Sequence, residues 1–580
     1  MYSKLLCNSP YLRQKCFKLF ESNIWIPKYG LNLIEERNCT FDKLKSITEN
    51  NLIDVHDFKS NPSNIFDIHE YVGYIDGSTA TKMTAQFNLF GGTIKNFGSE
   101  KHKEFLDKVN TLENIGCFAF TEKGYGNNAF KMETTLTYNK YDETIIINSP
   151  TLASEKSWIT NSVCHANYAV VFGQLIVDNI NYGPHPVLVK IRDDYGNILN
   201  NVTITDMGLK LGLNGVDNGI IKFDNFVADA NLLGGNISKF MDDGTFFTSN
   251  MKKREKFINF TDQLVSGRVC ISSMMLGCTK ALLNNTYKYA DKRFGVGLNG
   301  DSNMKIIDYG VQRNTIVPLL VRTIGFNLLL NEAKDLYRVK NDDKLRDELM
   351  TVAYSLKPML AWHTQEVVTK CRELTGGEGF KIANQFGEGF AGACAGITAE
   401  GDSKVLMMKT CMERIKKNTQ NMTFSNYIKL GTKKHTSFGS FSVDNLFFNK
   451  EEIILSELMT KINKDNYFEI TMQSHAHLLQ NAGKAYCEKK IYDKFEQVEK
   501  SNEYNNISEN IRDMKKYFLL DCVTRDPLWY SENSLTNLSL RNVTKEKLKL
   551  EKKIGDSMSE IINSFELPES IIHAPMAKYK

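Results

Sequence analysis

The chain has 580 residues, 42% of them hydrophobic, which is enough for about three or four globular domains with their own cores. Its 72 Lys and Arg residues nearly balance 68 Asp and Glu residues, and the net charge of +4 indicates neither a nucleic-acid-binding protein nor a polybasic membrane anchor. Twelve cysteines lack C-x-x-C pairs and zinc-type spacing to histidines, so we expect free thiols in a reducing compartment and no metal site. The longest apolar stretch, residues 316–330, is interrupted by Pro318 and Arg322 and is too short to span a bilayer.

The predicted elements divide the chain into four domains. Residues 1–112 are predicted to form an N-terminal helical domain and residues 113–240 a β-domain. The β-domain contains six short β-branched runs, at residues 134–138, 144–147, 168–177, 187–191, 202–205 and 220–223. Because no helical pattern separates these runs, they favour an antiparallel barrel or sandwich. Helical periodicity returns over residues 241–430 and, beyond a polar connector at residues 432–442, continues in a second C-terminal helical domain, residues 431–580. The sequence therefore predicts a multidomain α+β fold.

Glu400 is the strongest catalytic candidate. It lies between Ala399 and Gly401, so little side-chain bulk shields its carboxylate from a flat ligand or a thioester chain. A glutamate beside a glycine near a helix start also serves as an N-terminal cap or dipole partner. The local pattern leaves both interpretations open.

Two polar loops of the β-domain are candidates for binding a flat cofactor. Thr121 precedes Gly124 and Gly126 after an apolar strand-like run, and its hydroxyl is a possible donor; the alternative is a strand-to-turn threonine. Trp158 and Thr160 are two residues apart, so in an extended segment both side chains face the same way. A ring to stack and a hydroxyl to donate suit a flavin, whereas the alternative is a buried tryptophan with a bonded N–H.

At these and other motifs the sequence resembles the acyl-CoA oxidases, within the wider acyl-CoA dehydrogenase family. The resemblance extends from about residue 85 to 575, and the last segment, residues 564–575, looks like the end of the extra helical domain that oxidases carry. The motifs that carry it are residues 121–127, 133–135, 214–219, 222–225, 266–269, 293–295, 376–380 and 398–402.

The resemblance implies an FAD-dependent oxidase of fatty acyl-CoA. Such an enzyme removes two hydrogens across Cα and Cβ to give a trans-2-enoyl-CoA and passes the electrons to O₂, producing H₂O₂. Glu400 matches the family's catalytic base, and its backbone N–H matches the oxyanion donor. This role is physically reasonable, because the α-proton of a thioester is weakly acidic and needs a base of raised pKa beside donors that hold the enolate.

The resemblance also assigns the cofactor contacts. Thr121 matches the residue at the flavin pyrimidine edge and Thr160 the residue beside N5, while Gly376 and Gly377 match glycines that receive FAD from the neighbouring subunit of a homodimer. Arg268 is predicted to contact CoA, although a helix-surface salt bridge is an alternative. The remaining predicted cofactor contacts are Trp158, Gly126, Arg293 and Gln312.

Two alternatives remain open. Thr160 occupies the place of an oxidase glycine that leaves room for O₂, which motivates a dehydrogenase with a protein electron acceptor. Asp291 and Gly310 replace a usual Arg and Gln, which motivates a structural paralogue without cofactor. The resemblance implies a peroxisomal location, although the final Lys578-Tyr579-Lys580 is not a Ser-Lys-Leu type of tag.

Overall fold

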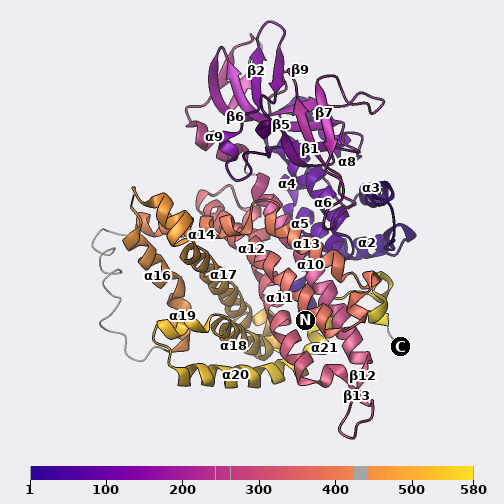
Figure 1. The fold of residues 1–580 in the computed structure, drawn as a ribbon, viewed down its shortest axis with the longest axis vertical. Coiled ribbons are helices and arrows are strands. Elements are labelled where there is room, and N and C mark those ends of the chain that lie inside the picture. Colours follow the sequence, from indigo (N-terminus) through magenta and orange to yellow (C-terminus); the bar gives the residue numbers. More distant parts are fainter. Residues whose placement is uncertain (1, 242, 262, 422–441, 464, 579–580) are drawn as a thin grey trace. The chain divides into compact units, whose positions relative to one another are not determined.

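The computed structural model describes residues 2–241, 243–261, 263–421, 442–463 and 465–578 (Figure 1). The chain forms two compact units. The first, here called the N-terminal unit, is Tyr11–Met274; the second, the C-terminal unit, combines Met1–Pro10 with Met275–Lys580. The predicted polar connector lies outside the described residues except for Ser442, as does the predicted boundary at residues 430 and 431. The division into four domains stays a prediction.

Helices form the first part of the N-terminal unit. Asn32 begins α3 through a capping box, in which its side chain accepts from the N–H of Glu35 while Glu35 bonds back to the N–H of Asn32. Asp76 caps α6 by accepting from the N–H of Thr79 at 2.8 Å. The elements are α2 (Pro10–Phe20), α3 (Leu33–Glu49), α4 (Asp57–Ser60), α5 (Pro62–Gly73), α6 (Gly77–Met83), the π-helical segment η2 (Thr84–Gly91), α7 (Gly92–Phe97) and α8 (Lys103–Asn110).

A β-domain follows, and each of the six predicted runs falls within or overlaps a strand. The strands are β1 (Gly116–Ala119), β2 (Thr135–Asn139), β3 (Thr144–Asn148), β4 (Lys156–Thr160), β5 (Tyr168–Val177), β6 (Ile180–Lys190), β7 (Val202–Asp206), β8 (Asn218–Phe223), β9 (Phe226–Asp229), β10 (Ser238–Phe240) and β11 (Phe246–Thr248). One sheet has the order β1-β5-β2-β3-β9 with β6 also on β5, and a second has the order β4-β8-β7. The buried core of the β-domain is built by inward side chains such as Ile145, Ile147 and Val171.

The strand pairing is mixed. β5 pairs in parallel with β1 and β2, whereas β6 pairs with it antiparallel. Parallel neighbours need long connections, and both β1 and β2 reach β5 through intervening elements, whereas β5 and β6 form a hairpin. The predicted α+β class is confirmed, but the expectation of a wholly antiparallel β-domain is wrong, because β1 and β2 pair in parallel with β5.

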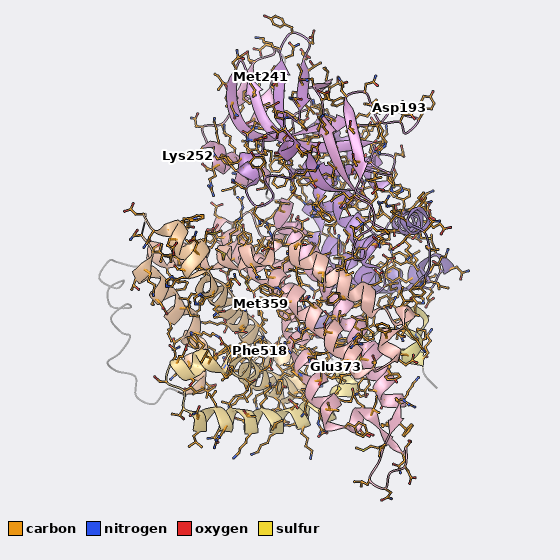
Figure 2. The ribbon with its side chains drawn as sticks, in the orientation of Figure 1. Asp193, Met241, Lys252, Met359, Glu373 and Phe518 are labelled. Atoms are coloured by element: carbon orange, nitrogen blue, oxygen red, sulfur yellow. The ribbon has the colours of Figure 1, made fainter. Side chains whose placement is uncertain are left out.

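The rest of the chain is helical. α9 (Lys253–Phe260) precedes the long α10 (Gln263–Lys292), and a short hairpin, β12 (Phe294–Gly295) with β13 (Met304–Lys305), separates α10 from α11. The following helices are α11 (Gly310–Arg338), α12 (Asp343–Leu374), α13 (Phe386–Thr398), α14 (Ser403–Asn421), α16 (Val443–Lys461), α17 (Ala476–Glu499), α18 (Ser508–Arg525), α19 (Pro527–Glu532), α20 (Asn537–Asp556) and α21 (Met558–Asn563); α1 (Tyr2–Leu6) belongs to the same unit. Their side chains, Met359 and Phe518 among them, are drawn in Figure 2.

α11 is long and apolar enough to cross a membrane, judged by length and composition among the described residues. However, 83% of its apolar window is buried inside the protein. Core helices of globular proteins have the same composition, because an all-round apolar helix is stable wherever other helices cover it. α11 is therefore a core helix of the C-terminal unit.

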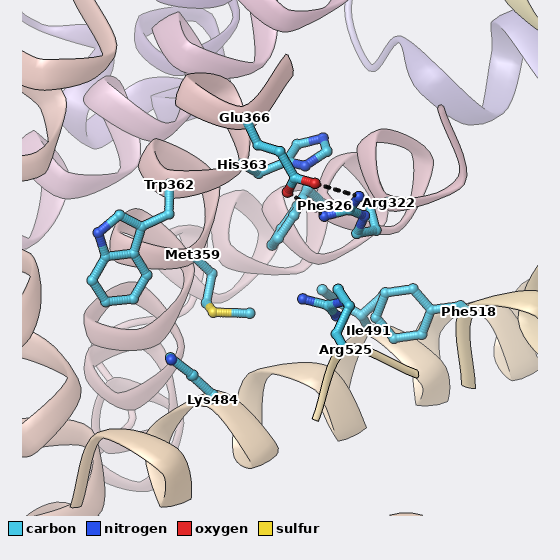
Figure 3. Close-up of a pocket in the computed structure, with 10 residues that line it drawn as sticks. All are labelled: Arg322, Phe326, Met359, Trp362, His363, Glu366, Lys484, Ile491, Phe518 and Arg525. Atoms are coloured by element: carbon cyan, nitrogen blue, oxygen red, sulfur yellow. Dashed lines mark hydrogen bonds and ion pairs between the residues drawn. The ribbon is translucent and has the colours of Figure 1, made fainter. Parts of the chain in front are cut away.

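A cavity of about 240 Å³ lies among α11, α12, α17 and α18 (Figure 3). Arg322 donates to both carboxylate oxygens of Glu366 on its wall, at 2.5 and 3.0 Å. The buried carboxylate of Asp521 lies 3.4 Å from Nε of Arg322. The same carboxylate accepts a hydrogen bond from Nε of Arg525 at 3.1 Å. Burial alone would raise the pKa of Asp521, but these guanidinium groups and Lys547 lower it. Carboxylates thus balance the positive charge of both arginines. None of the predicted site residues lines this cavity.

Candidate active site

The predicted base lies in the turn between α13 and α14. Glu400 is half-buried and has a φ of +55°, followed by Gly401 with a φ of +103°. A left-handed backbone is uncommon for residues other than glycine, and such strained positions concentrate at functional sites. Asp402 caps α14, since its Oδ1 accepts from the N–H groups of Lys404 at 3.0 Å and Val405 at 3.2 Å. The capping role that was an alternative for Glu400 therefore belongs to Asp402.

Thr121 follows β1 in the N-terminal unit. Its carbonyl accepts from the N–H of Ser157 at 2.8 Å, which places it beside β4. Its side chain is half-buried, and its hydroxyl makes no hydrogen bond within the described part of the chain. The hydroxyl can therefore bond to a ligand without breaking an internal contact.

The segment around Thr121 is supported by a buried ion pair at the next residue, Glu122. Lys156 donates to Glu122 at 2.9 Å, and both side chains are 0% exposed. The Glu122 carboxylate also accepts from the backbone N–H groups of Glu133 and Thr134, at 2.8 and 3.0 Å. Burial lowers the pKa of Lys156 to about 8, although Glu122 opposes the shift. These bonds fix the path of the chain on either side of Thr121 and β4.

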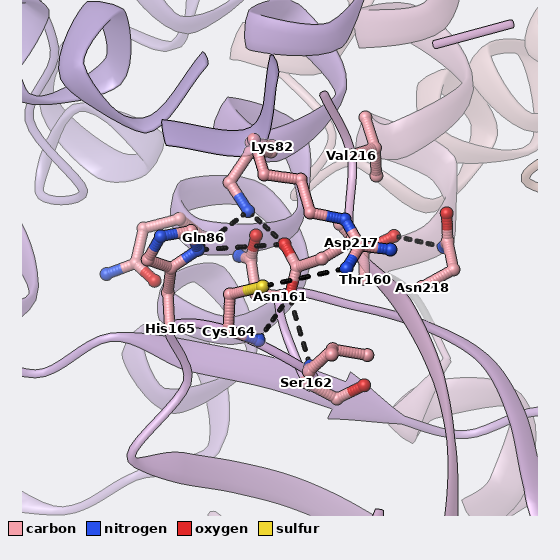
Figure 4. Close-up of polar contacts among 12 residues, drawn as sticks. Lys82, Gln86, Thr160, Asn161, Ser162, Cys164, His165, Val216, Asp217 and Asn218 are labelled. Atoms are coloured by element: carbon pink, nitrogen blue, oxygen red, sulfur yellow. Dashed lines mark hydrogen bonds and ion pairs between the residues drawn. The ribbon is translucent and has the colours of Figure 1, made fainter. Parts of the chain in front are cut away.

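Trp158 lies in an irregular part of β4. The register with β8 shifts between Lys156 and Ile159, and Trp158 has a φ of +62°. Ile159 is buried, whereas Trp158 is 59% exposed. The alternative of a buried tryptophan is therefore wrong, and the indole is available for stacking. Asn218 donates to the hydroxyl of Thr160 at 3.2 Å and orients that side chain (Figure 4).

The loop after Thr160 rests on the buried carboxylate of Asp217. Its Oδ2 accepts from the N–H groups of Val163 at 3.0 Å and Cys164 at 2.8 Å, and Lys82 of α6 forms an ion pair with it (Figure 4). Both Lys82 and Asp217 are 0% exposed. Burial would raise the pKa of Asp217, but Lys82 and the hydrogen bonds from His165 and the loop outweigh it and lower the pKa. Neither residue was predicted as a site residue, although Asp217 lies within one of the family-like motifs.

The same cluster has the composition of a metal site. One ligand atom each of Cys164, His165 and Asp217 lies within 4.8 Å of the others. However, the ammonium of Lys82 bonds the carboxylate and lies 3.3 Å from Nδ1 of His165. A protein cation already neutralises this carboxylate, so the cluster is an ion-pair network that holds the loop.

Gly376 and Gly377 follow α12 in the C-terminal unit. Both are exposed, and an added Cβ would meet nothing within 4 Å at either position. Gly376 needs its φ of +57°, but Gly377 has a φ of −62°, so neither packing within the chain nor backbone conformation explains a glycine there. Close approach of a ligand or of another chain would explain it. Gln312 donates to the carbonyl of Leu374 at 3.2 Å, while its buried Oε1 has no hydrogen-bond partner among the described residues.

The carboxylate of Asp291 forms an ion pair with a lysine 14 residues later in the sequence. Lys305 on β13 donates to its Oδ1 at 2.9 Å, across the hairpin that follows α10. Arg293, two residues after Asp291, is exposed. Lys305 neutralises the carboxylate of Asp291, which would otherwise be unfavourable beside a phosphate-bearing ligand.

The other two predicted contacts differ in exposure. Arg268 on α10 is only 7% exposed, so the alternative of an exposed helix-surface salt bridge does not describe its position. Gly126 is exposed, with open space around it. Thr121, Gly126, Trp158, Thr160 and Arg268 belong to the N-terminal unit, and Arg293, Gln312, Gly376, Gly377 and Glu400 to the C-terminal unit.

Comparisons with known proteins point to one family. Residues 262–413 match the family described as acyl-CoA oxidase, C-alpha1 domain. The peroxisomal acyl-coenzyme A oxidase 3 of Arabidopsis thaliana is 28% identical over 581 residues, which cover 95% of this chain and 85% of that protein. Human peroxisomal acyl-coenzyme A oxidase 3 is 28% identical over 400 residues, or 66% of this chain and 57% of that protein.

Solved structures agree in fold. Acyl-CoA oxidase 1 of Yarrowia lipolytica has a TM-score of 0.85 at 23% identity, covering 98% of this chain and 87% of that one. Acyl-CoA oxidase-1 of Caenorhabditis elegans, complexed with FAD and ATP, has a TM-score of 0.82 at 20% identity, covering 98% and 88%. The match over residues 262–413 and these relatives show that the chain is similar to the acyl-CoA oxidases, and the solved structures show that it has the same fold.

Proposed function

We propose that this protein is an FAD-dependent acyl-CoA oxidase that converts a fatty acyl-CoA to the trans-2-enoyl-CoA and reduces O₂ to H₂O₂. The similarity to acyl-CoA oxidases supports acyl-CoA oxidation, and the finer steps belong to the same proposal. The observation that carries it is Glu400, a half-buried carboxylate on a left-handed backbone whose helix-capping alternative is taken by Asp402. Backbone strain of this kind concentrates at functional sites, which supports a role for Glu400 beyond local stability.

In the proposed reaction, Glu400 accepts the α-proton of the thioester, and its backbone N–H donates to the thioester oxygen as negative charge develops there. A base in this role contributes about 10²–10⁴-fold to the rate, and a fixed N–H donor contributes further electrostatic stabilisation. FAD, when bound, supplies the acceptor for the hydride that leaves Cβ.

Cofactor contacts are proposed in each unit by itself. The hydroxyl of Thr121, which makes no hydrogen bond to another described residue, would bond a ring edge, while the exposed indole of Trp158 would stack. Gly376 and Gly377 would allow close approach of phosphate-bearing parts of the cofactor held by a second subunit. Arg293, Gln312 and Gly126 are proposed as further contacts, and Arg268 as a CoA contact.

A homodimer is part of the proposal, since neither packing among the described residues nor backbone conformation explains a glycine at position 377. Large apolar side chains beside them support it: Phe380 is 86% exposed and Ile382 60% exposed. Exposed apolar groups gathered at one place are typical of contact surfaces. The names of the relatives from Arabidopsis and human support a peroxisomal location for this chain.

A dehydrogenase is the second candidate, because Asn218 holds the Thr160 side chain in the place where oxidases have a glycine. One experiment separates the two. Purified protein is mixed with palmitoyl-CoA in air, and enoyl-CoA and H₂O₂ are measured together. Equal amounts support the oxidase; enoyl-CoA only with an added electron acceptor would identify a dehydrogenase, and neither product with a colourless protein would favour the cofactor-free alternative.

A further inference from the structure

A buried lysine lies under the turn that carries Glu400. Lys357 belongs to α12 and is 0% exposed. Its Nζ donates to the carbonyl of Ile397 at 3.2 Å, to the carbonyl of Gly401 at 2.7 Å and to Oγ of Ser403 at 3.4 Å. These acceptors precede and follow Glu400 in sequence.

An ammonium group has three N–H bonds to donate, and three acceptors of this turn lie within hydrogen-bonding distance of the Nζ of Lys357. Two of the acceptors are backbone carbonyls that a helix end leaves available: Ile397 lies in the last turn of α13, and Gly401 lies beyond it. Oγ of Ser403 also donates to the carbonyl of Ile397 at 2.7 Å, so the same oxygen receives two donors. A single side chain from another helix thus joins the end of α13 to the start of α14.

The turn has a conformation that needs such support. Glu400 and Gly401 both have left-handed backbones, with φ of +55° and +103°. Glycine adopts such a φ without penalty, so the strain lies at Glu400, where it costs about 1–3 kcal/mol and persists only because the surroundings over-determine the conformation. The fixed carbonyls on both sides determine the direction in which the N–H of Glu400 points.

We propose that Lys357 is a positioning residue for the base: it holds residues 397–403 so that the carboxylate and N–H of Glu400 keep a single orientation. This rests on the proposed function, because the orientation matters only if Glu400 acts on substrate. Charge-assisted hydrogen bonds to carbonyls are stronger than neutral ones, and a buried ammonium has no water to replace them.

The test is Lys357→Met in the full-length protein, with Lys370→Met as the control, because Lys370 lies on the same helix and is exposed. Hydrogen–deuterium exchange should become at least tenfold faster in residues 397–403 of the first variant only. With palmitoyl-CoA, kcat should fall about a hundredfold while KM stays within about twofold, since displacement of a reacting group by about 1 Å costs that much. Flavin content should stay unchanged in both variants.

Unchanged exchange and kcat in Lys357→Met would overturn the proposal. A variant whose exchange rises throughout the C-terminal unit, with flavin lost and KM raised, would also overturn it, because that pattern indicates general packing. Ser403→Ala is a milder second variant, which keeps both carbonyl bonds and should lower kcat by less than tenfold. If the wild-type protein forms no enoyl-CoA, the proposed function fails, whereas the exchange measurement still decides whether Lys357 holds the turn.

Discussion

Replacing Lys82 by methionine tests whether the buried ion pair supports the loop beyond Thr160. Lys82 and Asp217 are both 0% exposed, and the variant leaves the carboxylate with the N–H groups of Val163 and Cys164 but without its cation. Removing one partner of such a pair costs about 3–5 kcal/mol of folding free energy, whereas replacing an exposed lysine such as Lys103 costs within about 0.5 kcal/mol.

The assay is urea unfolding of full-length Lys82→Met, Asp217→Asn and the double variant, compared with Lys103→Met. The double variant removes both charges, so it should be more stable than the sum of the single losses predicts, by at least about 1 kcal/mol. A loss below about 1 kcal/mol in Lys82→Met, or strict additivity in the double variant, would refute the reasoning.

The pH dependence has a defined sign. The folded-state pKa of Asp217 is lowered, so its stabilisation is fully present above the unfolded value of about 3.9 and is lost as the pH falls through the folded pKa. The difference between wild type and Asp217→Asn should therefore be constant near neutral pH and decrease only below about pH 4. A difference that changes between pH 6 and 8 would contradict this assignment.

Four other outcomes are expected. Glu400→Gln should lower turnover at least about a hundredfold while the flavin absorption band persists; loss of flavin would count against its role as base. Thr160→Gly should speed reoxidation of the reduced enzyme by O₂ in stopped-flow experiments, and an unchanged rate would show that this side chain does not limit oxygen access. Gly377→Leu should leave the melting temperature of the apoprotein unchanged, because its Cβ meets nothing within 4 Å, but should reduce FAD retention on gel filtration. Lys305→Met should weaken FAD binding by leaving Asp291 uncompensated, and equal affinity in equilibrium dialysis would exclude an electrostatic role for the pair.

The strands were the most predictable part of the fold. The run at residues 168–177 coincides with β5, and the run at residues 144–147 lies within β3, because β-branched residues between turn formers report a half-buried strand locally. The parallel pairing of β1 and β2 with β5 was not predicted, since the partner of a strand depends on contacts far apart in sequence. The α+β order of helices, sheet and helices followed from periodicity alone.

The candidate site residues came from local patterns, whereas the contacts that support them could not be predicted. Glu400 and Trp158 were found from their neighbours and the family-like motifs, yet their left-handed backbones have no signature in the sequence. The ion pair of Lys82 with Asp217 joins residues 135 positions apart, and Lys357 bonds a turn 40 or more positions away. Such pairs arise from packing, and a single sequence contains no local pattern that identifies them.

The most direct test of the account is an aerobic turnover experiment on the purified full-length protein. Its absorption spectrum should contain the flavin band, and palmitoyl-CoA should bleach that band without air and yield equal amounts of enoyl-CoA and H₂O₂ with air. The Glu400→Gln variant should keep the band and lose the bleaching. A flavin-loaded wild-type protein that palmitoyl-CoA fails to bleach, or a Glu400→Gln variant that is bleached at the wild-type rate, would contradict the proposal that this carboxylate removes the α-proton.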